Sequence, residues 1–324
     1  MLIAAAAILL GFIILIWSAD LFVSGAASIA ENMGMSPIVI GLTIVSLGTS
    51  APEVLVSIIA AMSNAGDLAV GNAIGSNIAN MGLVLGITIL IVPMSIHHAC
   101  MRQEVPALIV VTLGVGLLLL DGEISKIDGS LMMGALFLIL FHMVRSQSGD
   151  SSLVVEAEKE PLQHLRPIRA WITFAFGLIL LVASSRLLVW GAITIAEQLG
   201  VSELVIGLTI VAIGTSLPEL AATMASALRG HTEIALGNII GSNLFNLLGV
   251  MSIPGIINGE LLDPSVLSRD YAAMTGITLI LAAGIQVGRK RKRAPVDHAY
   301  LGRSMGALLL ALYGGYYYWL YSTL

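Results

Sequence analysis

The chain has 324 residues, of which 57% are hydrophobic and 11% charged, and its formal net charge is −5. An ordinary soluble domain does not carry so many apolar residues, so the composition predicts a membrane protein, and we expect no nucleic-acid partner. The single cysteine, Cys100, excludes an internal disulfide.

Apolar runs separated by polar breaks predict ten membrane-spanning helices, each close to the roughly 20 residues that a bilayer core requires. The first run lacks a basic flank and a convincing cleavage site, so we expect a helix there rather than a removed signal. The predicted fold class is therefore an all-α membrane protein with ten transmembrane helices. The spans lie near 2–30, 36–63, 68–92, 104–121, 128–146, 169–197, 202–228, 234–257, 270–288 and 302–321.

A polar stretch from Ser146 to Arg166 divides these helices into two groups of five. Because this stretch is too short for a domain, we expect a first five-helix repeat over 1–146, a cytoplasmic linker over 147–168 and a second five-helix repeat over 169–324. Each half has an odd number of crossings, so the second half enters the membrane from the opposite side. The two repeats are therefore inverted, and their matching motifs should meet near the midplane.

The distribution of basic residues predicts the orientation in the bilayer. If the N terminus is outside, twelve Lys and Arg residues of the loops lie on the cytoplasmic face, and only Lys126 and Arg269 lie outside, as the positive-inside rule requires. We expect a multi-pass protein of the cell inner (plasma) membrane with both termini outside. The basic run from Arg289 to Arg293 is interpreted as a topological anchor, with binding of anionic lipid as the alternative.

One part of the sequence occurs twice, displaced by 166 residues. Residues 41–53 read GLTIVSLGTSAPE and return at 207–219 as GLTIVAIGTSLPE, while residues 71–80 read GNAIGSNIAN and return at 237–246 as GNIIGSNLFN. Each copy places a Glu inside an apolar stretch that should cross the membrane. A carboxylate at that depth is energetically unfavourable, so its default interpretation is an ion or proton pathway.

The first motif of each copy combines hydroxyls, a carboxylate and a proline. On a helix, Thr49 and Ser50 share a face with Glu53, because they precede it by four and three residues. Pro52 lacks an N–H, so we expect a kinked helix and freed carbonyl oxygens near Ser46. The second half repeats the set as Thr215, Ser216, Pro218 and Glu219.

The second motif predicts a polar stripe on the following helix of each half. Its Asn and Ser residues are spaced by four, and glycines at the same spacing allow another backbone to come close. The stripes consist of Asn72, Ser76 and Asn80, and of Asn238, Ser242 and Asn246; the glycines are Gly71, Gly75, Gly237 and Gly241.

Together these helices offer carboxylate, hydroxyl, amide and carbonyl oxygens. Such a set suits hard cations such as calcium, with 6–8 oxygen ligands, or sodium, whereas zinc or copper favours His and Cys. A single copy of the pattern would fit simple helix packing or a protonated Glu. Recurrence of the whole set at one offset favours an ion site.

The motifs GTSxPE and GNxxGSN, present in both halves, resemble the two alpha-repeats of the cation/calcium exchanger superfamily, in particular its sodium/calcium exchangers. The resemblance covers nearly the whole chain, with alpha motifs at 41–86 and 207–252. It implies an exchanger and not an enzyme, which transports calcium and sodium without a cofactor, and whose first and sixth helices slide against a fixed core. The ligands that it implies are Thr49, Ser50, Glu53, Ser76, Asn80, Thr215, Ser216, Glu219, Ser242 and Asn246, with the carbonyls of Ser46 and Ala212.

Three positions within the resemblance bear on the coupling ion. The proton-coupled branch of the superfamily typically has Glu where Ser76 and Ser242 stand, which implies the sodium-coupled branch. Potassium-dependent relatives carry Asp where Asn246 stands, which argues against potassium coupling. A third sodium on neutral oxygens would make exchange for one calcium electrogenic.

We therefore expect a sodium/calcium antiporter that works by alternating access. A proton-coupled calcium exchanger is the first alternative, with protons carried by Glu53 and Glu219. A cation channel would also need oxygen ligands, but its sites must be weak or multiple. An intramembrane hydrolase based on Ser50 and Glu53 would lack an intramembrane His or Lys base. The oligomeric state is open.

One pair of repeat-related positions differs in charge. At the offset of 166, Asp20 of the first helix corresponds to Arg186 of the sixth. We hypothesise a salt bridge between them that ties the two helices together. The alternative is that each side chain faces a water-filled vestibule or extends to the interface.

Overall fold

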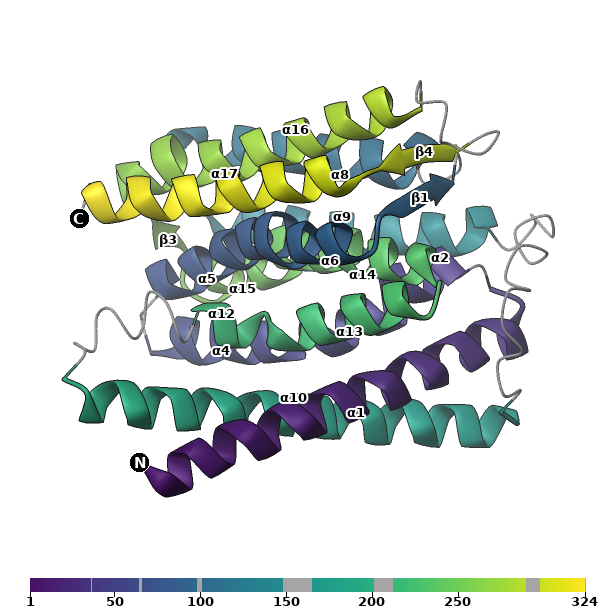
Figure 1. The fold of residues 1–324 in the computed structure, drawn as a ribbon. Coiled ribbons are helices and arrows are strands. Elements are labelled where there is room, and N and C mark those ends of the chain that lie inside the picture. The colour runs from purple at the N-terminus through teal and green to yellow at the C-terminus, as the bar shows by residue number, and fades with distance from the viewer. Residues whose placement is uncertain are drawn as a thin grey trace.

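The computed structural model describes residues 1–35, 37–63, 66–97, 101–147, 165–200, 212–289 and 298–323. Helices form nearly all of this part of the chain, and most of them run roughly parallel or antiparallel to one another (Figure 1). The all-α class is confirmed. The helices coincide with the predicted apolar runs to within a few residues, because the hydrocarbon thickness fixes their length.

The helices of the first half begin with α1 and include several that are interrupted by short wider or tighter turns. In chain order they are α1 (Leu2–Met33), α2 (Pro37–Ile40), the π-helical η1 (Gly41–Val45), α3 (Ser46–Thr49), α4 (Ala51–Met62), α5 (Gly66–Ala79), the π-helical η2 (Asn80–Val84), α6 (Leu85–Ile91), α8 (Glu104–Leu118), the 3₁₀ turn η3 (Leu119–Asp121) and α9 (Lys126–Gln147).

The second half follows the same order. Its described helices are α10 (Pro167–Gln198), α12 (Ala212–Thr215), α13 (Leu217–Leu228), α14 (Thr232–Leu244), the π-helical η6 (Phe245–Val250), α15 (Ser252–Ile257), the π-helical η7 (Val266–Tyr271), α16 (Ala272–Gly288) and α17 (Arg303–Ser322). The first part of the predicted span 202–228, up to residue 211, lies outside the described residues.

Among the described residues, six helices are long and apolar enough to cross a membrane, and a seventh span consists of two helices bent by 52° between Thr49 and Ala51. The helices α9, α13 and α17 lie at predicted spans as well. The total of ten crossings and the boundaries of the two repeats stay predictions.

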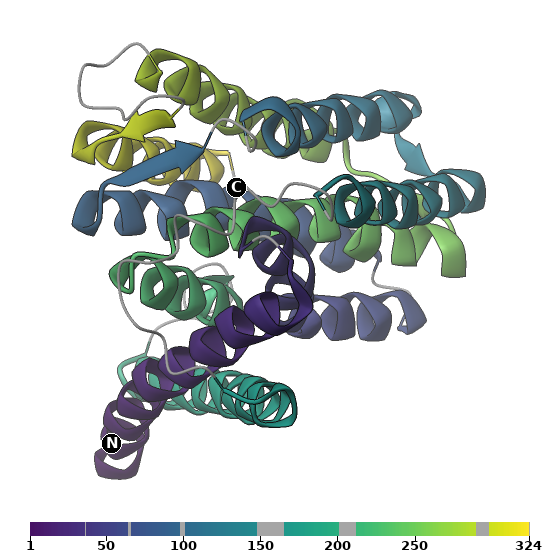
Figure 2. The ribbon, with the colours of Figure 1, turned by 90° about the vertical axis from the view of Figure 1, so that its right-hand side faces the viewer.

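The helices α1 and α10 form a long antiparallel pair along one side of the molecule (Figures 1 and 2). Glycines make their contact close: a Cβ added at Gly25 would lie 2.5 Å from the backbone nitrogen of Phe174, and one at Gly177 would lie 2.5 Å from that of Phe22. Because no side chain separates the two backbones at these points, the pair packs as one unit.

Two short antiparallel strand pairs join loops, and neither was expected from the apolar pattern. The strand β1 (Met94–His97) pairs with β4 (His298–Leu301), and β2 (Glu123–Ile124) pairs with β3 (Glu260–Leu261). The helices bring these loops together, and pairing then satisfies backbone groups that would otherwise lack partners.

Loops that are predicted to lie on the same side of the membrane lie at the same end of the molecule. At one end, Thr232 at the start of α14 donates a hydrogen bond to the carbonyl of Ser95 in β1 at 3.4 Å. At the other end, Asn258 donates to the carbonyl of Ala61 at 2.8 Å. Both chain termini lie at the end opposite β1 and β4 (Figure 1).

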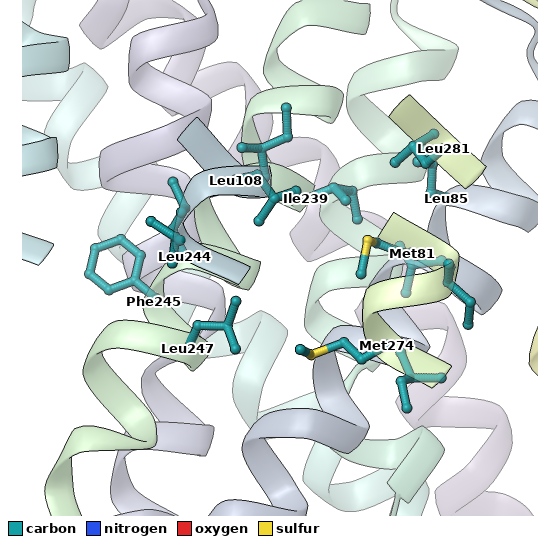
Figure 3. Close-up of a cluster of buried hydrophobic side chains, with 14 of the residues drawn as sticks. Met81, Leu85, Leu108, Ile239, Leu244, Phe245, Leu247, Met274 and Leu281 are labelled. Atoms are coloured by element: carbon teal, nitrogen blue, oxygen red, sulfur yellow. The ribbon is translucent and has the colours of Figure 1, made fainter. Parts of the chain in front are cut away.

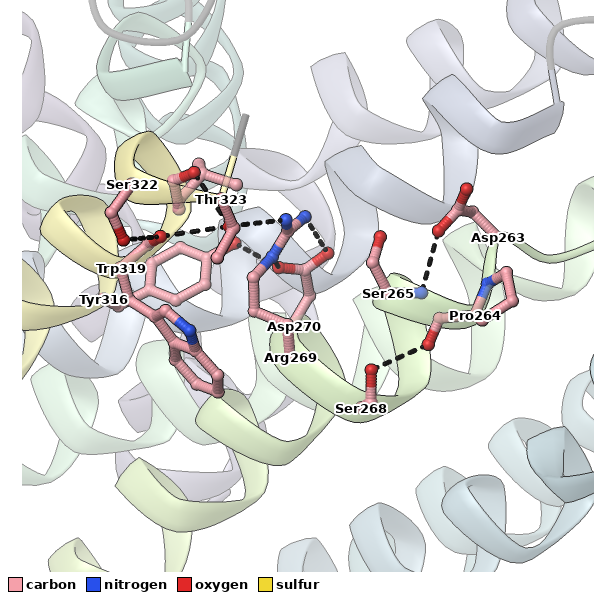
Figure 4. A network of polar contacts seen from close by, with 11 residues as sticks. Asp263, Pro264, Ser265, Ser268, Arg269, Asp270, Tyr316, Trp319, Ser322 and Thr323 are labelled. Carbon is pink, nitrogen blue, oxygen red and sulfur yellow. Dashed lines mark hydrogen bonds and ion pairs between the residues drawn. The ribbon is translucent and has the colours of Figure 1, made fainter.

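A polar cluster stabilises the end at which the C terminus lies (Figure 4). Arg269 of η7 donates to Asp270 at 2.7 Å and to the hydroxyl of Thr323 at 3.0 Å, and Tyr316 of α17 donates to Asp270 at 3.1 Å. These contacts hold the start of the ninth predicted span against the end of the tenth.

The apolar core lies between the third helices of the two halves and α16 (Figure 3). Met81 and Leu85 come from the first half, and Ile239 and Leu244 come from the second. The span Thr232–Ile257 is buried throughout its most apolar window, against 33% for α1. The second half's polar stripe is therefore enclosed in protein and does not face lipid.

Candidate ion-binding site

The two motif glutamates begin equivalent helices. Glu53 lies in the first turn of α4 and Glu219 in the first turn of α13, and each is only 1% exposed. The residues before these helices, Ser50 and Ser216, have nearly the same backbone angles, with φ of −83° and −88° and ψ of 3° in both. Positive charge at a helix N-terminus favours a carboxylate there, so both helices are oriented to support their glutamate.

The predicted kink in the first motif is confirmed at Ser50, where the helix bends by 52°. The Ser46 carbonyl is not left free by this kink. It accepts the backbone N–H of Ser50 at 2.9 Å and lies 3.3 Å from the Thr49 hydroxyl. Its role as a cation ligand stays a prediction.

The motifs of the two halves meet, as inverted repeats require. The hydroxyl of Ser50 donates to Oε1 of Glu219 at 3.4 Å, and the Thr49 hydroxyl also lies beside this carboxylate. Glu53 and Glu219 are close enough to interact electrostatically. Two like charges buried together favour binding of a cation between them.

Most of the predicted ligands are buried on the helices that surround the glutamates. Ser76 lies on α5, Asn80 begins η2, Ser242 lies on α14 and Asn246 lies in η6, and all four are buried. The short helix α12 begins at Ala212 and ends at Thr215, directly before Ser216. Wider π-helical turns at Asn80 and Asn246 were not expected, although such turns are frequent at functional sites.

The predicted ligands leave oxygens that bond to nothing in the described part of the chain. Buried polar atoms are nearly always hydrogen-bonded, so several unbonded oxygens on neighbouring helices fit a cation. The Nδ2 of Asn246 is also unbonded and is not a cation ligand. The unbonded oxygens are of the kinds that calcium and sodium accept. They are Oε2 of Glu53 and of Glu219, Oγ of Ser216 and of Ser242, and Oδ1 of Asn80 and of Asn246.

A family model described as sodium/calcium exchanger protein matches residues 3–145 and 169–322. The chain belongs to this family. Its members are transporters and not enzymes, so the hydrolase alternative is excluded, and the exchange of cations is the activity that the site must explain.

Similar proteins match the exchanger over nearly its whole length. The CaxA protein of Alkalimonas amylolytica is 44% identical over 100% of both chains. The inner membrane protein YrbG of Escherichia coli is 37% identical over 99% of this chain and 96% of its own. Among solved structures, the sodium-calcium exchanger NCX_Mj has a TM-score of 0.82 and 32% identity over 97% of each chain.

Sequence reasoning missed two buried amides of the exchanger. Asn77 donates to the backbone carbonyl of Asn243 at 3.2 Å, and Asn80 donates to the side-chain oxygen of Asn243 at 3.3 Å. These bonds join the third helices of the two halves. The sequence did mark these residues, because Asn77 and Asn243 are the last residues of GNxxGSN in each copy. They were missed because they do not fall on the four-residue spacing of the predicted polar stripe.

The predicted close approach of a motif glycine is confirmed in the second half. A Cβ added at Gly241 would lie 2.5 Å from the hydroxyl of Ser46, and one at Gly41 would lie 2.5 Å from the carbonyl of Ile234. Thus η1 of one half packs directly on α14 of the other. Leu208, the counterpart of Leu42 at the offset of 166, lies outside the described residues.

The proposed pair of Asp20 and Arg186 is wrong. Asp20 is paired with Arg229 at the end of α13, while Arg186 is exposed on α10. The reason is the register of the antiparallel pair, in which Gly11 packs against Leu188. Arg186 therefore lies opposite residue 13, about seven residues or roughly 10 Å along the helix from Asp20.

Proposed function

We propose that the chain is a sodium/calcium antiporter that works by alternating access and does not require potassium. The observation that carries the proposal is the pair of buried carboxylates, Glu53 and Glu219, with buried unbonded oxygens on the neighbouring motif helices of both halves. A site built by both inverted repeats lies where a movement of one part against the other can open it to either side.

The charges of the site support competition between the two ions. Two carboxylates neutralise one calcium ion or two sodium ions, so the same ligands serve either load. A third sodium would sit on neutral oxygens and leave the loaded carrier with one positive charge. The neutral residues Ser76, Ser242 and Asn246 support sodium coupling without potassium.

The resemblance and the relatives support the physiological setting. We infer that the inward sodium gradient drives calcium out of the cell across the inner membrane, with both termini outside. The similarity to an inner membrane protein of Escherichia coli supports the compartment, and the location of both termini at one end of the molecule agrees with an even number of crossings.

Calcium-45 flux into proteoliposomes tests the proposal, with sodium, potassium and proton gradients imposed one at a time. We expect an outward sodium gradient to drive calcium uptake, and we expect a potassium gradient to leave this uptake unchanged. Uptake driven by a proton gradient alone would indicate the proton-coupled alternative. Preloading with unlabelled calcium should stimulate entry of labelled calcium by counterflow, which a channel would not show.

A further inference from the structure

A chain of two hydrogen bonds connects the ion site to residues outside it. The hydroxyl of Thr49 donates to Oδ1 of Asn238 at 3.1 Å, and Nδ2 of Asn238 donates to the hydroxyl of Thr223 at 2.9 Å. All three side chains are fully buried. The chain joins α3 of the first half to α14 and α13 of the second, and Asn238 is its middle member.

The direction of these bonds matters for a cation. A hydroxyl binds a cation through an oxygen lone pair, so its hydrogen must point to another acceptor. Asn238 lies nearer to the Thr49 hydroxyl than the Ser46 carbonyl does, at 3.1 Å against 3.3 Å, and the carboxylate of Glu219 beside the hydroxyl is a third acceptor. If the amide were reversed, its N–H would donate to Thr49 and occupy the lone pair that a cation needs.

Thr223 contacts the nitrogen end of the amide. Its oxygen accepts from Nδ2 of Asn238, which leaves Oδ1 for Thr49. We propose that Asn238 is a positioning residue, held by Thr223, that orients the Thr49 hydroxyl so that its lone pairs face the bound cation. This inference rests on the proposed function, because it takes Thr49 as a calcium ligand.

The other half does not make the same chain in this conformation. At the offset of 166, Asn72 corresponds to Asn238 and Ser57 to Thr223. Ser57 donates instead to the carbonyl of Val250 at 2.8 Å, and Nδ2 of Asn72 has no partner among the described residues. The second hydrogen bond of the chain is therefore formed at Asn238 and not at Asn72.

A double-mutant cycle tests the proposal through the calcium concentration that gives half-maximal uptake. Asn238→Leu keeps the size of the side chain but removes the acceptor, and we expect it to raise that concentration by about three- to tenfold. In a Thr49→Val background, which has no hydroxyl to orient, Asn238→Leu should have no further effect. In a Ser242→Ala background its full effect should remain.

Thr223 provides an independent variant if Asn238→Leu does not fold. Thr223→Val removes the acceptor that holds the amide and should raise the half-maximal concentration by a smaller factor, whereas Thr223→Ser should retain the wild-type value. Equal effects of Asn238→Leu in the Thr49→Val and Ser242→Ala backgrounds would overturn the proposal. So would a lower maximal rate at an unchanged half-maximal concentration.

The result also separates this inference from the proposed function. If wild type shows sodium-driven uptake and Glu53→Gln does not, the antiporter assignment stands and the cycle alone decides the role of Asn238. If wild type shows no sodium-driven calcium uptake, both fail.

Discussion

Asp20 of α1 forms an ion pair with Arg229, which follows the last residue of α13. Nε of Arg229 donates to Oδ1 of Asp20 at 2.6 Å, and the same guanidinium donates to the hydroxyl of Ser24. Both charged residues line a cavity of about 740 Å³ between α1 and α13, whose other walls are apolar. The pair therefore crosses a loosely packed joint between the first half and the second.

Removing one partner of this pair should weaken the joint. Because the side chains are 28% and 52% exposed, we expect Arg229→Gln or Asp20→Asn to lower the free energy of unfolding by about 0.2–1 kcal/mol. Thermal unfolding in detergent measures the loss. Asp20→Arg combined with Arg229→Asp should recover part of it, and Arg186→Gln is the matched control. An equal loss in Arg186→Gln would contradict the observed pairing.

The two buried glutamates should both be essential. Glu53→Gln or Glu219→Gln leaves a divalent ion only half neutralised in a site of low dielectric, so calcium uptake into proteoliposomes should be abolished. Glu123→Gln, an exposed change on β2, should transport like wild type. Wild-type uptake by purified Glu53→Gln would remove Glu53 from the site.

Two buried serines should respond in opposite ways to alanine. Ser216 has no hydrogen-bond partner in the described part of the chain, so Ser216→Ala should weaken calcium affinity and leave thermal stability unchanged. Ser57 donates to the carbonyl of Val250 at 2.8 Å, so Ser57→Ala should lower the free energy of unfolding by about 1 kcal/mol. Calcium titration and thermal unfolding of both variants check the contrast. A loss of stability in Ser216→Ala with unchanged affinity would count against a ligand role.

Membrane potential should bias the transport cycle. If three sodium ions exchange for one calcium ion, each cycle moves one net charge, for which 100 mV is worth about 2.3 kcal/mol. Clamping the vesicle potential with valinomycin and potassium should change the rate of calcium uptake. Indifference to voltage would indicate an electroneutral cycle and argue against the third sodium.

Glu260 of β3 should give a pH-dependent contribution to stability. Its burial raises the pKa of the carboxyl above the ordinary value, and the negative charge of Asp67 raises it further. The proton is therefore bound more tightly in the folded state, so stability falls as pH rises through the folded pKa. Glu260→Gln should raise the unfolding temperature near pH 8 and leave it unchanged near pH 4. No difference between these two pH values would show that Glu260 does not contribute.

The repeated motifs predicted the pair of carboxylates because their chemistry is local. A Glu three residues after Ser50 lies on the same face of any helix, and the repeat supplies Glu219 in the same setting. The helices were predictable for a related reason, since the bilayer fixes the length of each apolar run.

The partners of Asp20 and Thr49 could not be predicted in the same way. Which residue meets Asp20 depends on the register of α1 against α10 and α13, and that register is set by glycines such as Gly25. The contact between Thr49 and Asn238 joins residues 189 positions apart. Contacts between residues so far apart in the sequence depend on how the whole bundle packs. The spacing of residues along one helix does not reveal that packing.

The close packing of α1 on α10 bears on how ions are exchanged without leakage. Each of these helices begins one of two inverted halves, and their backbones meet at Gly25 and Gly177 without intervening side chains. Because α1 and α10 pack as one unit, the pair can occupy only one position at a time. In the alternating-access cycle proposed above, a displacement of this pair that widens the approach from one side narrows the approach from the other. Exchange without leakage then needs no separate gate for each side. Opening the site to both sides together would require the helix pair to be in two positions at once.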